Sequence, residues 1–279
     1  MKLVSYRKAG IDGYGVVVGE GGIVDAGKRL GLPSLRAVLA QGRLADLKPL
    51  AAMAPDFSLT DVELLPPIPD PEKILCVGLN YKSHVAEVGR DLPANPSLFG
   101  RFTNTLVAAG KPIIRPKVSS HLDYEGELAM VIGKPGRNIS EADALRHVAG
   151  YSCFNDGSLR DYQKHSVTAG KNFQATGGFG PWIVTADAVA DPEALELTTR
   201  LNGQQVQHSN SSLLIYSLAK IISYISEFTA LEPGDVIATG TPEGVGARRD
   251  PPLWMKAGDV VEVEIAGIGL LRNPIVDQA

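Results

Sequence analysis

The segment that reveals most about how this chain folds is His121-Leu-Asp-Tyr-Glu-Gly-Glu-Leu-Ala-Met-Val-Ile-Gly133. Its apolar residues predict a largely buried strand over Leu122–Ile132. Side chains of a strand alternate between its faces, so Glu125 and Glu127 point the same way, with Cα atoms about 6.5–7 Å apart. Two carboxylates on one face of a buried strand repel each other and are costly to desolvate unless a cation joins them. Oxygen ligands of this kind suit Mg²⁺, Mn²⁺ or Ca²⁺ better than Zn²⁺.

A Glu-x-Glu pattern by itself is more often a solvated edge strand, so a third carboxylate matters. Asp156 follows a second apolar strand, Val148–Asn155. If the two strands pair, Asp156 joins the two glutamates as a third oxygen ligand and leaves positions for water or a chelating substrate. Asp123 and Asp161 are candidates for supporting these ligands, although an ordinary turn or cap role is more frequent for such residues.

A second polar group lies upstream, in Asn80-Tyr-Lys-Ser-His-Val-Ala-Glu87. A short helix after the predicted strand Ile74–Gly78 would place His84 and Glu87 on one face. A carboxylate bonded to an imidazole fixes the tautomer and raises the basicity of the ring, as a histidine that takes a proton from water requires. The spacing is common, so an exposed helical pair is an equally good interpretation.

Two loops have residues suited to anion recognition. Lys171, in Ala169-Gly-Lys-Asn-Phe173, could stabilise an enolate or carboxylate oxygen. The segment Ala238-Thr-Gly-Thr-Pro-Glu-Gly-Val-Gly246 offers backbone N–H groups and the Thr241 hydroxyl, but it lacks the Gly-Lys-Ser/Thr element of a phosphate loop. Taken alone, each loop is more often a turn than a site.

Composition excludes several classes of protein. The chain has 279 residues, 27 basic and 31 acidic side chains and 44% hydrophobic residues, which is typical of a globular protein and not of a disordered one. The net charge of −4 argues against a nucleic-acid partner. No apolar run is long enough to span a membrane or form a signal peptide, so we expect a cytoplasmic protein. Cys76 and Cys153 lie in apolar segments and are predicted to be reduced and buried.

The chain divides at a proline-rich stretch, Pro66–Pro71. Residues 1–70 predict a small α+β domain: a strand meander followed by two short helices, over 33–39 and 44–53. Residues 71–279 predict a mainly β domain with one amphipathic helix, Ser212–Phe228, covering a sheet. Besides those above, the predicted strands of this domain are Trp182–Thr185, Leu195–Asn202, Val236–Thr239, Val260–Ile265 and Ile268–Leu271.

Taken together, these segments resemble the fumarylacetoacetate hydrolase family. The motifs occur in family order from about Lys73 to Asn273, and as an ordered set they are highly specific. They are Gly78-Leu-Asn-Tyr-x-x-His84-x-x-Glu87, Leu122-Asp-Tyr-Glu125-x-Glu127-Leu, Gly150-Tyr to Asn155-Asp156 with Arg160-Asp-x-Gln163, Gly170-Lys-x-Phe173, Gly180-Pro-Trp182 and Gly240-Thr-Pro-x-Gly-Val-Gly246.

The resemblance implies an α+β, mainly β fold. Its catalytic domain has mixed sheets rolled around the active site, and a small N-terminal domain precedes it in the chain. Members of the family usually form homodimers. The resemblance also implies that the metal ligands for Mg²⁺, Mn²⁺ or Ca²⁺ are Glu125, Glu127 and Asp156. It further implies a water-activating dyad of His84 and Glu87, with Lys171 as a catalytic residue. The residues it places around the substrate are Tyr81, Arg101, Gln163 and Thr241.

The sequence also departs from the family pattern. Around the Glu-x-Glu pattern, where many relatives have a tryptophan and a branched aliphatic residue, this chain has Tyr124 and Gly126. After Asp156 it has Gly157, where valine is more usual. It also has Arg101 where a lysine is frequent. These changes leave the metal set intact and bear on the identity of the substrate.

The first prediction for the activity is metal-dependent hydrolysis of a carbon–carbon bond in a 2,4-diketo acid such as an acylpyruvate or fumarylpyruvate, giving a carboxylate and a 2-oxo acid. The alternative is a decarboxylase of oxaloacetate-like β-keto acids, or an isomerase or decarboxylase of aromatic-degradation intermediates. A remote alternative is a non-catalytic metal-binding dimer.

Overall fold

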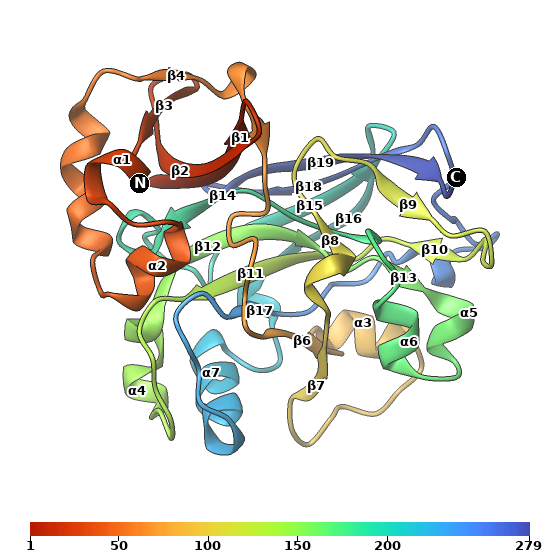
Figure 1. The fold of residues 1–279 in the computed structure, drawn as a ribbon. Coiled ribbons are helices and arrows are strands. Elements are labelled where there is room, and N and C mark those ends of the chain that lie inside the picture. Colours follow the sequence, from red (N-terminus) through yellow and green to blue (C-terminus); the bar gives the residue numbers. More distant parts are fainter.

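A mixed sheet of twelve strands organises the molecule (Figure 1). The computed structural model describes residues 1–279. Along the sheet the strands are β4 (Phe57–Ser58), β3 (Gly22–Asp25), β2 (Ile11–Val18), β1 (Lys2–Lys8), β14 (Gly177–Thr185), β12 (Val148–Asn155), β11 (Gly126–Ile132), β17 (Val236–Ala238), β6 (Ile74–Gly78) and β7 (Ser97–Gly100). Two short strands attach to its side, β5 (Glu63–Leu64) on β1 and β8 (Leu106–Val107) on β14.

A second sheet has five strands and packs against the first. In order these are β16 (Gln204–Asn210), β15 (Glu196–Leu201), β18 (Val260–Ile265), β19 (Gly269–Asp277) and β9 (Ile113–Arg115). A separate pair, β10 (Leu122–Asp123) and β13 (Ser158–Leu159), leads into the segments that carry the acidic residues. The mainly β architecture that the sequence predicts is confirmed.

The helices are short. The α-helices are α1 (Gly27–Leu30), α2 (Leu35–Ala40), α3 (Lys82–Glu87), α4 (Glu141–Ala144), α5 (Arg160–Gln163), α6 (Val167–Lys171) and α7 (Leu218–Phe228). The 3₁₀ segments cover Leu44–Ala52, Leu59–Asp61, Thr103–Thr105, Leu145–His147, Ala186–Ala188, Ser211–Leu213 and Gly246–Arg248. Figure 1 shows α3, α5 and α6 gathered at the end of the molecule away from the N-terminal strands. None of the helices is long and apolar enough to cross a membrane.

Helix α7 begins later than its apolar pattern predicts. Ser217 caps it, since the Ser217 hydroxyl oxygen accepts a hydrogen bond from the Lys220 N–H at 3.1 Å. Leu214 lies before the helix and forms an isolated β-bridge with Tyr81. Within the helix, four apolar side chains are fully buried, Leu218, Ile221, Ile222 and Ile225, and they belong to the hydrophobic cluster that includes Met130 of β11 and Ile237 of β17. Each stabilises the fold by about 1.5–3 kcal/mol through burial.

The N-terminal elements continue the main sheet. Strand β1 pairs with β14, with Lys2 opposite Val184, and Leu3 lies in the same hydrophobic cluster as Phe154 of β12. No helix or strand lies between β5 and β6, where the prolines occur. The division into residues 1–70 and 71–279 therefore stays a prediction, because the backbone pairing and the core both cross it.

Two further predictions concern local structure. The first predicted helix is present as α2, whereas Leu44–Ala52 is a 3₁₀ segment; Pro49 within it lacks the N–H that an α-helix needs. Cys76 and Cys153 are buried and free, as predicted.

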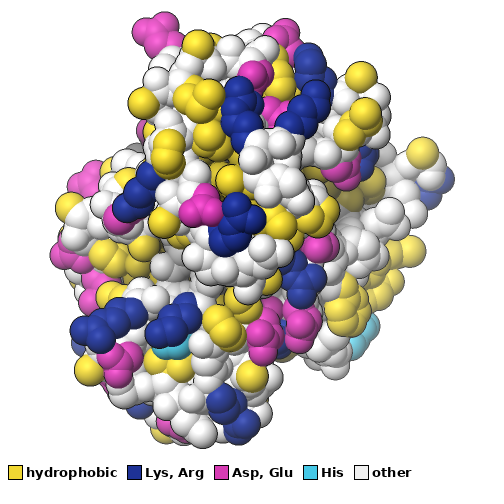
Figure 2. Space-filling view, turned by 60° about the vertical axis from the view of Figure 1, so that its left-hand side comes forward, with side chains coloured by type: hydrophobic (Ala, Val, Ile, Leu, Met, Phe, Trp, Pro, Cys, Tyr) yellow, Lys and Arg dark blue, Asp and Glu magenta, His cyan; other side chains and the backbone are white.

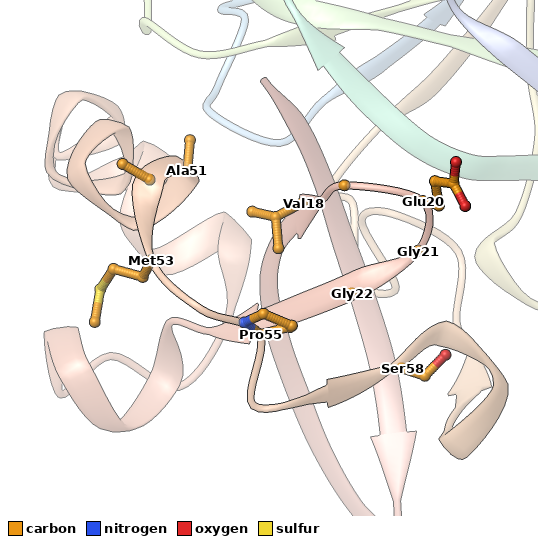
Figure 3. Close-up of a pocket in the computed structure, with 10 residues that line it drawn as sticks. Val18, Glu20, Gly21, Gly22, Ala51, Met53, Pro55 and Ser58 are labelled. Carbon is orange, nitrogen blue, oxygen red and sulfur yellow. The ribbon is translucent and has the colours of Figure 1, made fainter.

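A hollow of about 520 Å³ lies in the N-terminal part, between the β2–β3 turn and the end of the 3₁₀ segment Leu44–Ala52 (Figure 3). Its walls include Val18, Met53 and Pro55, and Glu20 is its only titratable side chain. The hollow therefore lacks the paired acid and base groups of a catalytic site.

On the outer surface, Lys and Arg side chains are interspersed with acidic and apolar ones over the face that Figure 2 presents.

Candidate metal centre

Three carboxylates meet where β11 and β12 lie side by side. The strands pair antiparallel with Gly126 opposite Asn155, and the Asp156 N–H donates to the Glu125 carbonyl oxygen at 2.8 Å. Oxygen atoms of Glu125, Glu127 and Asp156 all lie within 4.8 Å of one another. The three side chains are no more than 5% exposed, so the solvated edge-strand alternative is wrong.

Three basic side chains, two of them buried and one largely buried, surround these acids. The Lys171 ammonium donates to Glu125 and to Asp156 at 2.5 Å each and also to the Asp156 carbonyl oxygen at 3.2 Å. Arg101 pairs with the other oxygen of Asp156, and Arg160 pairs with Glu125 at 2.6 Å. Although burial opposes the charged form, Lys171 and Arg160 lower the pKa of Glu125 to about 2. Burial likewise opposes the charge on Lys171, but the carboxylates of Asp156 and Glu125 raise its pKa.

Glu127 differs from the other two acids because it has no ion-pair partner. Its carboxylate accepts one hydrogen bond, from the Gly240 N–H at 2.8 Å. Burial and then the negative charges of Asp156 and Glu125 raise the pKa of Glu127 well above its usual value. A divalent cation fits this set, since it would supply the missing positive charge and prefers hard oxygen donors. No histidine or cysteine belongs to the cluster, which fits Mg²⁺ or Mn²⁺ better than Zn²⁺.

Helix α3 carries the predicted dyad. The Nδ1 atom of His84 lies 2.9 Å from Oε2 of Glu87, and Oε1 of Glu87 accepts the Gly244 N–H at 2.8 Å. Glu87 therefore fixes the imidazole on one side and the 240–246 loop on the other. This arrangement leaves Nε2 of His84 as the ring nitrogen that can exchange a proton with a ligand. His84 is 6% exposed, so the exposed-pair interpretation is wrong.

Asp123 is fully buried and holds the site together. Its carboxylate accepts the Gly246 and Ala247 N–H groups at 2.8 and 3.0 Å and the Arg160 Nε–H at 2.8 Å. The turn or cap role expected for Asp123 is thus only part of its function, because it also orients the arginine that faces Glu125. The Asp161 carboxylate accepts one local hydrogen bond, from the Tyr162 N–H at 3.1 Å, and one from the hydroxyl of Ser119, 42 positions earlier, at 2.7 Å.

The triad and His84 line one cavity of about 640 Å³. Lys171, Gln163 and Thr241 also line it. Gln163 accepts a hydrogen bond from Arg160 at 3.0 Å, and the Thr241 hydroxyl donates to the Gly126 carbonyl oxygen at 3.0 Å. His121 and Trp254 also line the cavity, with ring centroids 4.9 Å apart.

Tyr81 and Arg101 lie outside the cavity lining. Tyr81 is 1% exposed and precedes α3, and Arg101 lies behind Asp156, where it also donates to the Gly157 carbonyl oxygen at 3.0 Å. The structure therefore places both as supports of the site, and we assign them no direct contact with substrate.

The departures from the family pattern have steric reasons. A Cβ atom on Gly126 would lie 2.1 Å from the Thr199 hydroxyl oxygen, and one on Gly157 would lie 1.9 Å from the Thr176 carbonyl oxygen. A larger residue at position 157 therefore requires the backbone to move, and one at position 126 requires at least the Thr199 side chain to move. The Tyr124 hydroxyl donates to the Gly244 carbonyl oxygen at 3.0 Å, so it holds the same loop that Glu87 binds.

Sequence reasoning gave no role to Arg160 or Asn80. Asn80 is fully buried and its amide donates to the carbonyl oxygen of Thr239 at 2.8 Å, next to the glycine that binds Glu127. Gly240 has φ +107°, and a Cβ there would lie 2.7 Å from the Asn80 Cβ. Both residues occur in motifs quoted above for the resemblance, Gly78-Leu-Asn-Tyr and Arg160-Asp-x-Gln163, and this is the signal by which the sequence could have indicated them.

Comparisons with known proteins show the family to which the chain belongs. Residues 73–276 match the model of the fumarylacetoacetate (FAA) hydrolase C-terminal family. A mitochondrial oxaloacetate tautomerase of Xenopus laevis is 43% identical over 224 residues, which cover 79% of this chain and 70% of that protein.

Solved structures are similar over the whole chain. A fumarylacetoacetate hydrolase from Exiguobacterium antarcticum is 36% identical, with a TM-score of 0.85 and complete coverage of both chains. A maleylpyruvate hydrolase from Sphingobium, solved with manganese(II) and pyruvate, is 28% identical with a TM-score of 0.83 and complete coverage of both chains. Since the family model covers most of the chain and the relatives share its fold, this protein belongs to the fumarylacetoacetate hydrolase family.

Proposed function

We propose that this protein is a divalent-cation-dependent enzyme that interconverts the keto and enol forms of oxaloacetate or a closely related 2-oxo acid. The observation that carries the proposal is the buried carboxylate triad, which lines one cavity together with His84, the histidine that Glu87 holds through Nδ1. The choice of oxaloacetate is supported by the oxaloacetate tautomerases among the relatives. These relatives support the oxaloacetate-like substrates of the alternative prediction, a decarboxylase, better than the carbon–carbon hydrolysis that was predicted first. The reaction itself, tautomerisation of oxaloacetate, was not among the predictions from the sequence.

Glu125, Glu127 and Asp156 would hold Mg²⁺ or Mn²⁺. When bound, the cation would draw electron density from the 2-oxo group and so make the neighbouring C–H more acidic. His84, held by Glu87, removes the proton from that carbon through Nε2, and a proton is returned to the 2-oxo oxygen, so atoms and charge balance. Lys171 compensates the charge of Glu125 and Asp156, while Thr241 and Gln163 border the space for the acid.

Hydrolysis of an acylpyruvate-like substrate is a second candidate. It is supported by the maleylpyruvate hydrolase among the similar structures. The same dyad would then take its proton from water rather than from carbon. The two activities differ in product, because only hydrolysis releases a second carboxylic acid.

The test uses the purified full chain with Mn²⁺ or Mg²⁺. We expect the ultraviolet signal of enol-oxaloacetate to decay faster than with the cation alone, and we expect this acceleration to vanish in EDTA and in His84→Asn. Lys82→Gln, an exposed substitution on the same helix, is the matched control. Acceleration that persists in EDTA or in His84→Asn would contradict the proposal.

Two product assays separate the other candidates. Formation of pyruvate from oxaloacetate measures decarboxylation, and formation of acetate from acetylpyruvate measures hydrolysis. Metal-dependent acetate release without tautomerisation would favour the hydrolase, and no turnover in any assay would favour the non-catalytic dimer.

As further parts of the proposal, the chain works in the cytoplasm as a homodimer on a small keto acid. Light scattering should then give twice the chain mass of 29.6 kDa. A monomer mass at micromolar concentration would contradict this part alone.

A further inference from the structure

The cavity above the triad contains positive charges that the proposed chemistry does not use. Its basic lining residues are Arg90, Arg160, Lys164, Lys171 and Arg248, and its acidic ones are Glu125, Glu127, Asp156 and Asp161. A cavity with more bases than acids stands out in a chain whose net charge is −4. The surplus favours an anionic group in the part of the cavity where the unpaired bases lie.

The five basic residues of the lining fall into an inner pair at the triad, Arg160 and Lys171, and three outer ones, Arg90, Lys164 and Arg248. The two groups have different surroundings. Lys171 and Arg160, at the triad, form ion pairs with Glu125, and each also pairs with a buried aspartate. Arg90, Lys164 and Arg248 are exposed, and none forms an ion pair. The positive charge available to a ligand therefore lies at the mouth of the cavity.

Two of the outer bases come from segments that meet. Arg90 follows α3 by three residues, and Arg248 ends the 3₁₀ segment after the 240–246 loop. Nη2 of Arg248 lies 3.5 Å from the carbonyl oxygen of Val88, which is too long for a strong hydrogen bond but places Arg248 beside the end of α3. Both arginines line the same cavity, so they present two positive charges to an anion bound there.

We propose that Arg90 and Arg248 form a subsite for the second carboxylate of a 2-oxo dicarboxylic acid. This inference rests on the proposed function, which places the first carboxylate and the 2-oxo group at the triad. Guanidinium groups bind carboxylates through paired, charge-assisted hydrogen bonds. The cavity volume of about 640 Å³ is large for a four-carbon acid, so longer dicarboxylic acids fit the same arrangement.

The test compares two ligands that differ only at the far end, 2-oxoadipate and 2-oxohexanoate. Calorimetry on the Mn²⁺-loaded full chain measures both dissociation constants, and their ratio reports the subsite. We expect 2-oxoadipate to bind at least about tenfold more tightly, and Arg90→Gln or Arg248→Gln to reduce this preference by about tenfold. Lys82→Gln, which removes an exposed positive charge outside the cavity, should leave the preference unchanged.

The possible results separate this inference from the proposed function. Equal affinity for the two acids, or a preference that survives in both arginine variants, would overturn the subsite while tautomerisation of oxaloacetate remained intact. Failure to bind either acid, together with loss of oxaloacetate turnover, would overturn both.

Discussion

Replacing Glu127 with glutamine should have opposite consequences with and without a cation. Glu127 is 2% exposed and has one hydrogen bond and no basic partner. Burial, followed by the charges of Asp156 and Glu125, raises its pKa in the folded state. An acid whose pKa is raised by folding makes the protein less stable as the pH rises from about 4.3 towards the folded pKa. Without a cation, Glu127→Gln removes this loss, so the variant should be at least as stable as the wild type at pH 7.

With a cation the order reverses. At a Mn²⁺ concentration 100 times its dissociation constant, binding stabilises the folded state by about 2.7 kcal/mol. One kcal/mol raises the Tm by about 2–4 °C for domains of this size range, so the wild type should gain about 5–10 °C. Glu127→Gln leaves Glu125 and Asp156, both already paired with Lys171, and should gain little or nothing.

Calorimetric melting at several pH values, in EDTA and in Mn²⁺, measures both effects. Glu196→Gln is the matched control, because Glu196 is an exposed carboxylate on β15, outside the cavity. A variant that melts several degrees below the wild type in EDTA would show that Glu127 stabilises the cation-free fold. A variant that keeps the full Mn²⁺ shift would show that Glu127 does not bind the cation. Either result would refute the reasoning.

Three other substitutions test the surroundings of the site. Asp123→Ala leaves the Arg160 guanidinium and two backbone N–H groups without their partner, so the free energy of unfolding in urea should fall by about 3–5 kcal/mol. A decrease below about 1 kcal/mol would mean that water replaces the carboxylate. Gly126→Ala should lower the free energy of unfolding by about 1–3 kcal/mol because the new Cβ crowds the Thr199 hydroxyl. Thr199→Ala should then destabilise the Gly126→Ala variant less than it destabilises the wild type. Additive losses would contradict the clash. Ile222→Ala should lower the free energy of unfolding in urea by about 2–5 kcal/mol. Phe228→Ala, at a 57% exposed position of the same helix, should change it by less than about 0.5 kcal/mol. Equal losses would contradict the packing of α7.

Strand pattern and motif order predicted the core of the site. The strands now labelled β11 and β12 lie within the predicted ranges Leu122–Ile132 and Val148–Asn155, and their pairing brings the three carboxylates together. The prediction succeeded there because both strands are buried on both faces, so their residues are almost continuously apolar. The first strand is interrupted at Tyr124–Glu125, where the chain passes from β10 to β11.

Other parts of the fold could not be predicted in this way. Strand β16 was missed because Gln204–Asn210 is polar, and it forms by pairing with β15 rather than by burying an apolar face. The helix predicted from Ser212 starts only at Leu218, because the residues before it pair with the segment preceding α3. Both differences come from contacts between distant parts of the chain, which local periodicity does not report.

Side chains that act across such contacts were harder still to predict. Arg160 reaches Asp123, 37 positions earlier, and Lys171 reaches Glu125, 46 positions earlier. A lysine in a glycine-flanked loop indicates an anion but not which one. In the structure, the anions that Lys171 contacts are Glu125 and Asp156, two of the candidate metal ligands. Its first role is therefore to orient and neutralise these two carboxylates.

The buried charges of the site explain how an acidic protein can bind an acidic substrate. The buried acids at the site are Asp123, Glu125, Glu127 and Asp156, and the buried or largely buried bases are Arg101, Arg160 and Lys171. This set has one excess negative charge, which a divalent cation converts into one excess positive charge. Because the set is almost completely shielded from solvent, that change acts on a ligand with little screening by water or salt. We therefore expect a 2-oxo acid to bind measurably only after the cation, and the cation to bind more tightly when the acid is present, by the same factor.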